Sequence, residues 1–270
     1  MNINSNQSIS TAARMLNIAA DGSAKNVERL ATSIMINRAS DDAAGLSISE
    51  RMRAQFRGLD AASGNAADSI SMARTGESAL SQTHEALQRM RELAVQSSNG
   101  TYTDADRGVL QAEMNQLRSE IDRIGNTTEF STQKLLDGSA QGMTTQAGAN
   151  SGQTVSLSTG DMRSAALGVG SLDISTASGA AEAIDALDSA IRNVSGQRGN
   201  LGAIENRLYN TINNLNTASA NMRTAETLIR DTDMARETIR QTANDVLMQT
   251  SLAMMAQGNM ARQSVMQLMA

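Results

Sequence analysis

The sequence predicts a mainly α-helical protein, in which long antiparallel, coiled-coil-like helices form a rod, the terminal helices pair, and one small β-hairpin region interrupts the helices. Two long stretches carry a large apolar residue or an alanine at every seventh position, a spacing that places one seam along a helix. The chain contains no proline, so nothing forces a break in a long helix. The amino-terminal half is mirrored in the carboxyl-terminal half, which favours antiparallel pairing.

The composition favours thin seams between helices over a thick globular core. Only 1% of the 270 residues are aromatic, whereas 17 are methionine, and aromatic side chains normally fill much of a compact core. A formal net charge of −5 argues against nucleic acid or an anionic membrane as the main partner. No apolar run approaches the roughly 20 residues that span a bilayer, so membrane insertion is not expected. The absence of cysteine excludes disulfides, and we expect no conventional signal peptide.

The first predicted helix runs from Ser8 to Met35 and carries a stripe of mostly small apolar residues, too weak to hold a helix in isolation. A break follows at residues 37–42, where Asp41 and Asp42 place negative charge at the start of the next helix. That helix, about residues 45–99, carries the first seven-residue series.

A shorter helix and a segment of different character follow. Thr103 or Asp104 caps a helix over about residues 104–125. The segment from about 138 to 178 is rich in glycine, and we expect little regular helix there. Within it, Thr154 to Ser158 alternates polar and apolar residues, which predicts a strand that pairs with a second strand at Met143 to Ala147.

The second seven-residue series lies in a helix predicted over about residues 180–230. Apolar residues stay in phase across Gly196, Gly199 and Gly202, so we predict one continuous helix in which these glycines allow close packing. Residues 231–233 repeat the acidic break, and a last helix is predicted from Met234 to Ala270. The central helices together predict a rod core that consists of Met52, Leu59, Leu80, Leu87, Leu110, Leu117, Ile121, Leu187, Val194, Leu201, Leu208, Leu215, Met222 and Ile229.

The sequence contains no recognisable catalytic, cofactor-binding or metal site, and we do not expect an enzyme. Its single histidine, His84, lies on the polar side of a seam, and we expect it to be solvated. Residues 131–134 match a Ser-x-x-Lys pattern, which arises by chance and here lacks its companion motifs. The acidic residues at the two breaks could bind a cation, although helix caps explain them better.

Several long motifs resemble bacterial flagellins. Residues 37–46, Asn-Arg-Ala-Ser-Asp-Asp-Ala-Ala-Gly-Leu, are similar to the amino-terminal signature of that family. Residues 87–96, Leu-Gln-Arg-Met-Arg-Glu-Leu-Ala-Val-Gln, are similar to a second block. Near the carboxyl end, the residues Ile-Arg-Asp-Thr-Asp-Met-Ala-Arg-Glu at 229–237 are similar to another. The resemblance covers almost the whole chain in the right order.

The resemblance implies an inner domain of paired terminal helices with a spoke, residues 1–44 and 235–270, and an outer rod domain at 45–234. It implies a filament subunit that is exported through the flagellar type III channel, polymerises outside the cell and serves swimming motility. Implied partners are other copies of the chain, a flagellar export chaperone, the filament cap, the hook–filament junction proteins and a host flagellin-sensing Toll-like receptor. Little sequence is left for the variable outer region of the family, so the chain resembles a minimal form without outer domains.

Two alternative functions remain open. A hook–filament junction protein shares the terminal helices and a similar size. A flagellin with an enzymatic insert would need a segment far longer than residues 138–179. The chain also departs from the family pattern, because Ser33 replaces the usual glycine and Met35 the usual basic residue. These departures bear on the spoke and hence on the supercoil of the filament.

The resemblance also suggests residues that contact a receptor. In the family, Toll-like receptors contact the positions that Arg89, Leu93 and Glu113 occupy here. The alternative is that Arg89 and Glu113 are ordinary surface charges and that Leu93 packs beside the seam.

For assembly, we expect the terminal helices of a free subunit to be disordered, because they lack enough partners to offset the entropy that ordering costs. Packing in the filament would then order them. The residues expected to make these contacts are Leu16, Val27, Leu30, Ile34, Val246, Leu247, Ala253, Met254, Met260 and Leu268.

Overall fold

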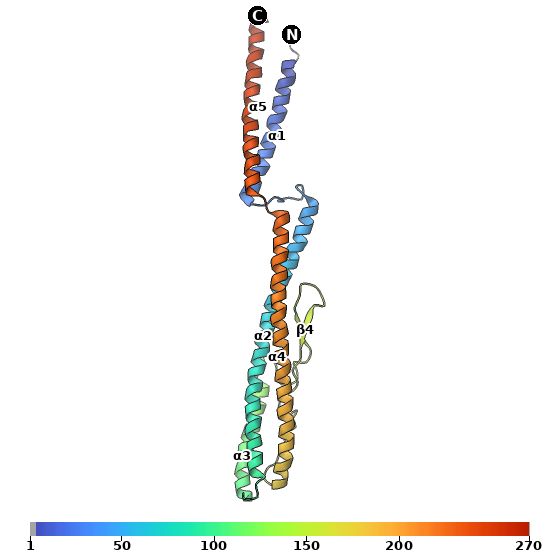
Figure 1. Ribbon diagram of the computed structural model, residues 1–270, viewed down its shortest axis with the longest axis vertical. Coiled ribbons are helices and arrows are strands. Elements are labelled where there is room, and N and C mark those ends of the chain that lie inside the picture. The colour runs from blue at the N-terminus through green and yellow to red at the C-terminus, as the bar shows by residue number, and fades with distance from the viewer. Residues whose placement is uncertain (1–3, 270) are drawn as a thin grey trace. The chain divides into compact units, whose positions relative to one another are not determined.

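The computed structural model describes the backbone of residues 4–269 and the side chains of residues 7–264 and 267. It divides into a terminal unit, Met1–Ala54 with Asn221–Ala270, and a central unit, Gln55–Ala220. The helices are α1 (Asn4–Thr32), α2 (Ala43–Ser97), α3 (Asp104–Thr127), α4 (Ala177–Arg230) and α5 (Met234–Met269) (Figure 1). The prediction of a mainly α fold built from long antiparallel helices is confirmed.

The central unit is organised around the two seven-residue series. The members of the α2 series from Leu59 to Ala94 are all buried, and so are those of the α4 series from Leu187 to Leu215. Ile121 of α3 is buried with them, whereas Leu110 and Leu117 are half-buried at the edge of the same core. The remaining predicted core residues lie in the terminal unit and are half-buried: Met52, Met222 and Ile229.

The segment between α3 and α4 closes one side of this core, which the sequence did not predict. Buried apolar side chains along it join the core of the helices: Leu135, Leu136, Leu157, Val169 and Ile174. Polar contacts then hold the segment against α3. The carboxylate of Asp122 accepts hydrogen bonds from the backbone N–H and hydroxyl of Ser164, at 2.9 and 2.8 Å. The guanidinium of Arg118 donates to the carbonyl of Gly170 at 2.7 Å.

Two antiparallel hairpins lie in this segment. The predicted one pairs β3 (Met143–Gln146) with β4 (Thr154–Leu157). The second pairs β1 (Glu129–Phe130) with β2 (Gln133–Lys134) and was not predicted. Its two-residue loop places Ser131 and Thr132 at φ values of 48° and 69°, the left-handed conformation that such tight turns need. That turn usually contains Asn-Gly, so the sequence carries no recognisable signal for it.

The glycines of α4 correct one prediction. The helix is continuous, as expected, and Val194 and Leu201 are buried. However, a Cβ atom added at Gly196, Gly199 or Gly202 would meet nothing within 4 Å. The expected close packing at these glycines is therefore wrong, because other residues of α4 face the core and the three glycines lie outside it.

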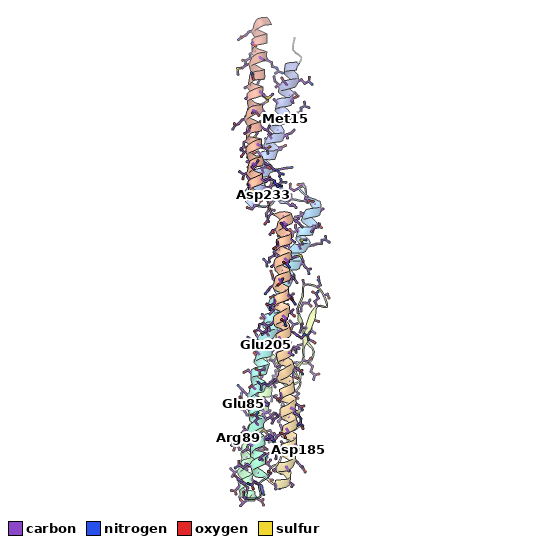
Figure 2. The ribbon with its side chains drawn as sticks, viewed as in Figure 1. Met15, Glu85, Arg89, Asp185, Glu205 and Asp233 are labelled. Carbon is purple, nitrogen blue, oxygen red and sulfur yellow. The ribbon has the colours of Figure 1, made fainter. Side chains whose placement is uncertain are left out.

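Helix starts follow the predicted caps. The carboxylate of Asp42 accepts from the N–H of Gly45 at 2.9 Å, and that of Asp233 accepts from the N–H groups of Ala235 and Arg236 at 3.1 Å. Figure 2 shows Asp233 at the base of α5. At the start of α3, the Thr103 hydroxyl accepts from the N–H of Asp106, whose carboxylate accepts from the N–H of Thr103. These bonds satisfy donors that the first turn of a helix leaves unpaired.

Candidate functional site

The terminal unit is built on one seam between α1 and α5, which lie side by side (Figure 1). The α5 residues of this seam recur at alternating spacings of four and three and are buried or half-buried: Glu237, Gln241, Asn244, Met248, Ser251, Met255 and Gly258. The matching α1 residues follow the same rhythm: Ile9, Ala12, Leu16, Ala19, Ser23, Asn26 and Leu30. The seam is therefore made mostly of small and polar residues.

One end of this seam is a polar cluster. The carboxylate of Glu237, whose side chain is 3% exposed, lies 3.5 Å from the Arg29 guanidinium and 3.2 Å from that of Arg240. With its amide turned to satisfy its neighbours, Asn26 also donates to this carboxylate, at 2.7 Å. The Gln241 amide donates to the Ser23 hydroxyl at 2.8 Å. A buried carboxylate with several donors tolerates burial because each donor offsets part of its lost hydration.

The other end of the seam is packed by small residues. A Cβ atom added at Gly258 would lie 2.6 Å from Cγ1 of Ile9, so a larger residue at 258 would push the helices apart. Ala12 and Ala19 of α1 are 4% and 2% exposed in the same seam. Small side chains on both helices thus let the two backbones come close.

Apolar faces of α5 that do not meet α1 are exposed. Val246, Leu247, Met254 and Met260, all predicted contact residues, are 53%, 51%, 58% and 64% exposed. Ala253 is exposed too, and the side chain of Leu268 lies outside the described residues. Ile239, Val246 and Leu247 line an apolar hollow of about 620 Å³ with Thr242 and Ala243. Contiguous exposed apolar patches of this kind are common at interaction surfaces of proteins.

The predicted contact residues of α1 are divided between the seam and the surface. Leu16 and Leu30 are half-buried in the seam with α5. Val27 is 52% exposed, and Met15 and Ile18, which also lie on α1, are 53% and 67% exposed. Ile34 lies beyond the helix, in the connecting segment.

Exposed large apolar side chains are concentrated in the terminal unit. Among the described side chains, those of the central unit are Val95, Val109 and Tyr209. The terminal unit carries Met15, Ile18, Val27, Met35, Ile48, Leu228, Met234, Ile239, Val246, Leu247, Leu252, Met254 and Met260. The sequence pattern alone did not separate these outward residues from those of the seam.

The two connecting segments of the terminal unit pair through their backbones. The N–H of Met35 donates to the carbonyl of Arg230 at 2.7 Å, and that of Thr232 donates to Ser33 at 3.1 Å. Ser33 has a φ of 60°, a left-handed conformation that favours glycine. The Asp41 carboxylate accepts from the N–H groups of Arg38 and Asn37, and these bonds, chiefly that of Arg38, lower its pKa.

The three candidate receptor residues lie together in the central unit, but only two reach the surface. Figure 2 labels Arg89 on α2. Its guanidinium donates to Glu113 on α3 at 2.9 Å and to Glu92 at 3.0 Å. These hydrogen bonds raise the pKa of Arg89, and the bond to Glu92 contributes most. Leu93 is fully buried in the helix core, which fits the alternative reading of packing beside the seam.

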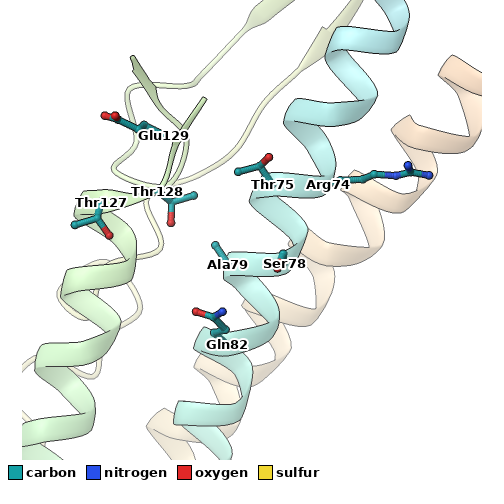
Figure 3. Close-up of a pocket in the computed structure, with 8 residues that line it drawn as sticks. All are labelled: Arg74, Thr75, Ser78, Ala79, Gln82, Thr127, Thr128 and Glu129. Carbon is teal, nitrogen blue, oxygen red and sulfur yellow. The ribbon is translucent and has the colours of Figure 1, made fainter. Parts of the chain in front are cut away.

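One groove of the central unit lies beside α2 and the end of α3. This shallow groove of about 530 Å³ is lined by Thr75, Gln82 and Thr128, while Arg74 at its edge points toward α4 (Figure 3). There Arg74 donates to Glu205 at 2.7 Å and lies over the Tyr209 ring. Among the residues that the structure describes, no cluster of three His, Cys, Asp or Glu residues is placed to hold a metal ion.

His84 corrects the prediction of a solvated side chain. It is half-buried on α2, its Nε2 lies 2.9 Å from the Gln88 amide nitrogen, and its Nδ1 is buried without a partner.

Comparisons with known proteins identify the family that has this architecture. Residues 3–141 match the bacterial flagellin N-terminal helical region, and residues 184–269 match the bacterial flagellin C-terminal helical region. The chain belongs to the bacterial flagellin family. It is 47% identical to the flagellin of Halalkalibacterium halodurans over 271 residues, with all of both chains covered. It is 42% identical to the flagellar filament 33 kDa core protein of Treponema phagedenis over 285 residues, again with full coverage of both.

This membership establishes the role: the chain is a structural subunit of the bacterial flagellar filament. It is of the minimal form, because all of it aligns with the H. halodurans flagellin and only the short segment with two hairpins separates α3 from α4. The family is one of structural proteins. Among the described helices, none is both long enough and apolar enough to cross a membrane.

Solved structures agree on the fold. The crystal structure of Bacillus cereus flagellin is 34% identical, with a TM-score of 0.52, over 60% of this chain and 94% of that one. A putative flagellar hook-associated protein from Vibrio parahaemolyticus has a TM-score of 0.58 at 15% identity, which shows a shared fold only. Full-length identity to flagellins favours the filament subunit over the junction protein.

Proposed function

We propose that the exposed apolar faces of α1 and α5 are the contacts through which copies of this chain pack in the flagellar filament. The observation that carries the proposal is that α5 uses one face to contact α1 and leaves its apolar faces exposed. The stripe from Glu237 to Gly258 is used within the chain, whereas Val246, Leu247, Met254 and Met260 remain exposed. Burying such side chains contributes about 1.5–3 kcal/mol each, so several together can drive association.

The proposal assigns the domains by role. Residues 1–44 and 235–270 form the inner, assembling domain, and residues 45–234 form the outer domain. The concentration of exposed apolar side chains in the terminal unit supports this assignment. That unit, residues 1–54 and 221–270, extends somewhat beyond the inner domain assigned here. We infer further that pairing of α1 with α5 is weak in a free subunit, since its seam is rich in small and polar residues. Neighbouring copies would then stabilise both helices as they pack.

A pair of aspartate substitutions tests this proposal. Val246→Asp should abolish polymerisation, because it places a charge inside the contact between copies. The matched control is Val109→Asp, which changes an even more exposed valine of α3. Salt-induced polymerisation, followed by sedimentation and negative-stain microscopy, measures the result. Filaments from the Val246→Asp chain, or equal loss of filaments with Val109→Asp, would contradict the assignment.

The same faces suggest how the chain is handled before assembly. We propose that it is exported through the flagellar channel and polymerises outside the cell, with a purely structural role. The apolar hollow at Ile239, Val246 and Leu247 would need cover before export, and an export chaperone is the partner that fits. Pull-down of the chaperone by wild type but not by Val246→Asp would support this, and equal capture would argue against it. The filament cap and the hook–filament junction proteins would meet the same terminal helices.

We also propose that a flagellin-sensing Toll-like receptor contacts Arg89 and Glu113, with Leu93 in a supporting role. The guanidinium and carboxylate are exposed and bonded to each other, so they present one polar patch. Leu93 is buried and would act by holding α2 in place. Arg89→Ala should weaken binding to the receptor ectodomain about tenfold or more, whereas Arg123→Ala, on α3 and paired with Glu120, should not. Unchanged binding of Arg89→Ala would remove it from the contact.

A further inference from the structure

Among the described side chains, the buried methionines and the exposed methionines lie in different units. Met72, Met90, Met114 and Met162 are 7%, 0%, 1% and 8% exposed, and all four belong to the helix core of the central unit. The exposed ones among the described side chains are Met15, Met35, Met234, Met254 and Met260, and all of them lie in the terminal unit.

Three exposed methionines are part of the apolar faces themselves. Met254 follows Leu247 by one heptad on α5, and Met260 follows Val246 by two. Met15 lies on α1 (Figure 2), three residues before the exposed Ile18. Their thioethers are accessible in a free subunit, at 53%, 58% and 64% exposure for Met15, Met254 and Met260.

We propose that Met15, Met254 and Met260 are oxidation sites at which a peroxide stops a free subunit from assembling. The inference rests on the proposed packing role of these faces. In the reaction, the thioether sulfur attacks one peroxide oxygen, an S–O bond forms, the O–O bond breaks, and water leaves. Sulfur is oxidised by two electrons to the sulfoxide, and the peroxide is reduced by the same two electrons.

The sulfoxide changes the character of the face. It converts a flexible apolar side chain into a polar one with a strong hydrogen-bond acceptor, which disfavours burial in a contact between copies. The core methionines are shielded from peroxide, so the central unit stays folded while the assembly faces lose their affinity. Oxidation would thus act on subunits that are not yet in a filament.

The first measurement is the order of oxidation. The full-length free chain is treated with hydrogen peroxide, and sulfoxide at each methionine is quantified by peptide mass spectrometry. Met15, Met254 and Met260 should oxidise about tenfold or more faster than Met90 and Met114, because access of peroxide limits the reaction. In assembled filaments, Met254 and Met260 should oxidise more slowly than in the free chain. Equal rates for all methionines of the free chain would overturn the inference.

The second measurement is polymerisation. Untreated chain should polymerise, and oxidised chain should need about a tenfold higher concentration to do so. The triple variant Met15→Leu, Met254→Leu and Met260→Leu keeps similar apolar volumes and should polymerise before and after peroxide. The control Met72→Leu, at a core methionine, should remain sensitive to peroxide.

The outcomes separate this inference from the proposed packing role. Untreated wild type that fails to polymerise would refute the packing role itself. Oxidised wild type that polymerises normally, or a triple variant that stays sensitive, would overturn the oxidation sites alone. If the triple variant does not assemble even untreated, the test uses oxidised wild type. Reduction of its sulfoxides by a methionine sulfoxide reductase should restore polymerisation. Failure to restore polymerisation would count against the inference.

Discussion

Glu237 on α5 and Arg29 on α1 lie 3.5 Å apart, and the Glu237 side chain is 3% exposed. This pair and the surrounding amides stand at the base of the seam between the terminal helices. A buried carboxylate in the seam restricts which registers are compatible, because a shifted register would leave it buried without partners. Glu237 therefore helps to set how α1 and α5 align.

Replacing this carboxylate should loosen the terminal helices. Glu237→Ala would leave Arg29 and Asn26 without their acceptor, at a cost of about 1–3 kcal/mol. Hydrogen exchange of α1 and α5 backbone amides in assembled filaments measures the change, and both helices should exchange faster. The control Glu182→Ala, at an exposed glutamate of α4, should leave exchange in α1 and α5 unchanged. Unaltered protection in Glu237→Ala would mean that the pair does not hold the seam.

The three open glycines of α4 predict a gain in stability. A Cβ atom at Gly196, Gly199 or Gly202 meets nothing within 4 Å, and alanine is favoured over glycine in a helix by about 1 kcal/mol. Each Gly→Ala substitution should therefore raise the free energy of unfolding by about that amount. Urea unfolding of the free chain, followed by circular dichroism, gives the value.

The matched control on the same helix is Gly179→Ala, whose Cβ would lie 2.4 Å from the backbone oxygen of Asp173. It should destabilise the chain. A loss of stability at the three open positions would contradict the expectation that a methyl group fits there without strain.

Ser33 predicts a gain of a different kind. Its φ of 60° costs a non-glycine residue about 1 kcal/mol, and glycine is the residue that the family usually has there. Ser33→Gly should strengthen the pairing of the connecting segments, so the N–H of Thr232, which donates to the carbonyl of Ser33, should exchange a few-fold more slowly. Ser40→Gly, where φ is not positive, should not slow this exchange. Faster exchange in Ser33→Gly would contradict the strain.

The capping box of α3 predicts a pH dependence. The Thr103 hydroxyl donates to the Asp106 carboxylate at 2.7 Å and lowers its pKa below the ordinary value of 3.8. A lowered folded pKa means that the contribution of Asp106 to stability is complete above its ordinary pKa and is lost as pH falls through the folded one. Thr103→Ala should therefore cost about 1 kcal/mol near neutral pH and less in acid.

Urea midpoints at neutral pH and at about pH 3 or below test this, since the difference between wild type and Thr103→Ala should shrink as Asp106 becomes protonated. Thr101→Ala, in the same turn and outside the capping box, should cause little change at either pH. A gap that stays constant with pH would show that Asp106 does not contribute to the cap.

Much of the fold could be read from residue patterns. The seven-residue series located α2 and α4, and the caps at Asp42, Thr103 and Asp233 located the helix starts. The alternation at Thr154–Leu157 located one hairpin. The hairpin at Ser131 and Thr132 could not be predicted, because two left-handed residues without glycine carry no local signal. The burial of Leu135, Leu136 and Ile174 also escaped, since irregular segments have no period that points them to a core.

The candidate site was predicted only in part. The sequence predicts assembly contacts on α5, including Val246 and Met254, from their heptad spacing. None of these predicted α5 residues belongs to the seam that α5 forms with α1. That seam, from Glu237 to Gly258, has too few apolar residues to form a recognisable series. The heptad spacing reveals apolar stripes on a helix. It does not show which stripe packs within the chain and which packs against another copy.

The sequence by itself thus determined the helices, the capped helix starts and the family to which the chain belongs, because these depend on local periodicity, capping and long motifs. The first helix was placed less well, since it spans Asn4–Thr32 and not the predicted Ser8 to Met35. Only the tertiary structure decided which face of α5 lies against α1 and which faces stay open. That choice depends on complementarity between two distant segments: Gly258 fits Ile9, and Glu237 finds Arg29. Small and polar residues that look unremarkable one at a time pack well together, and the apolar stripes are left outside for other copies.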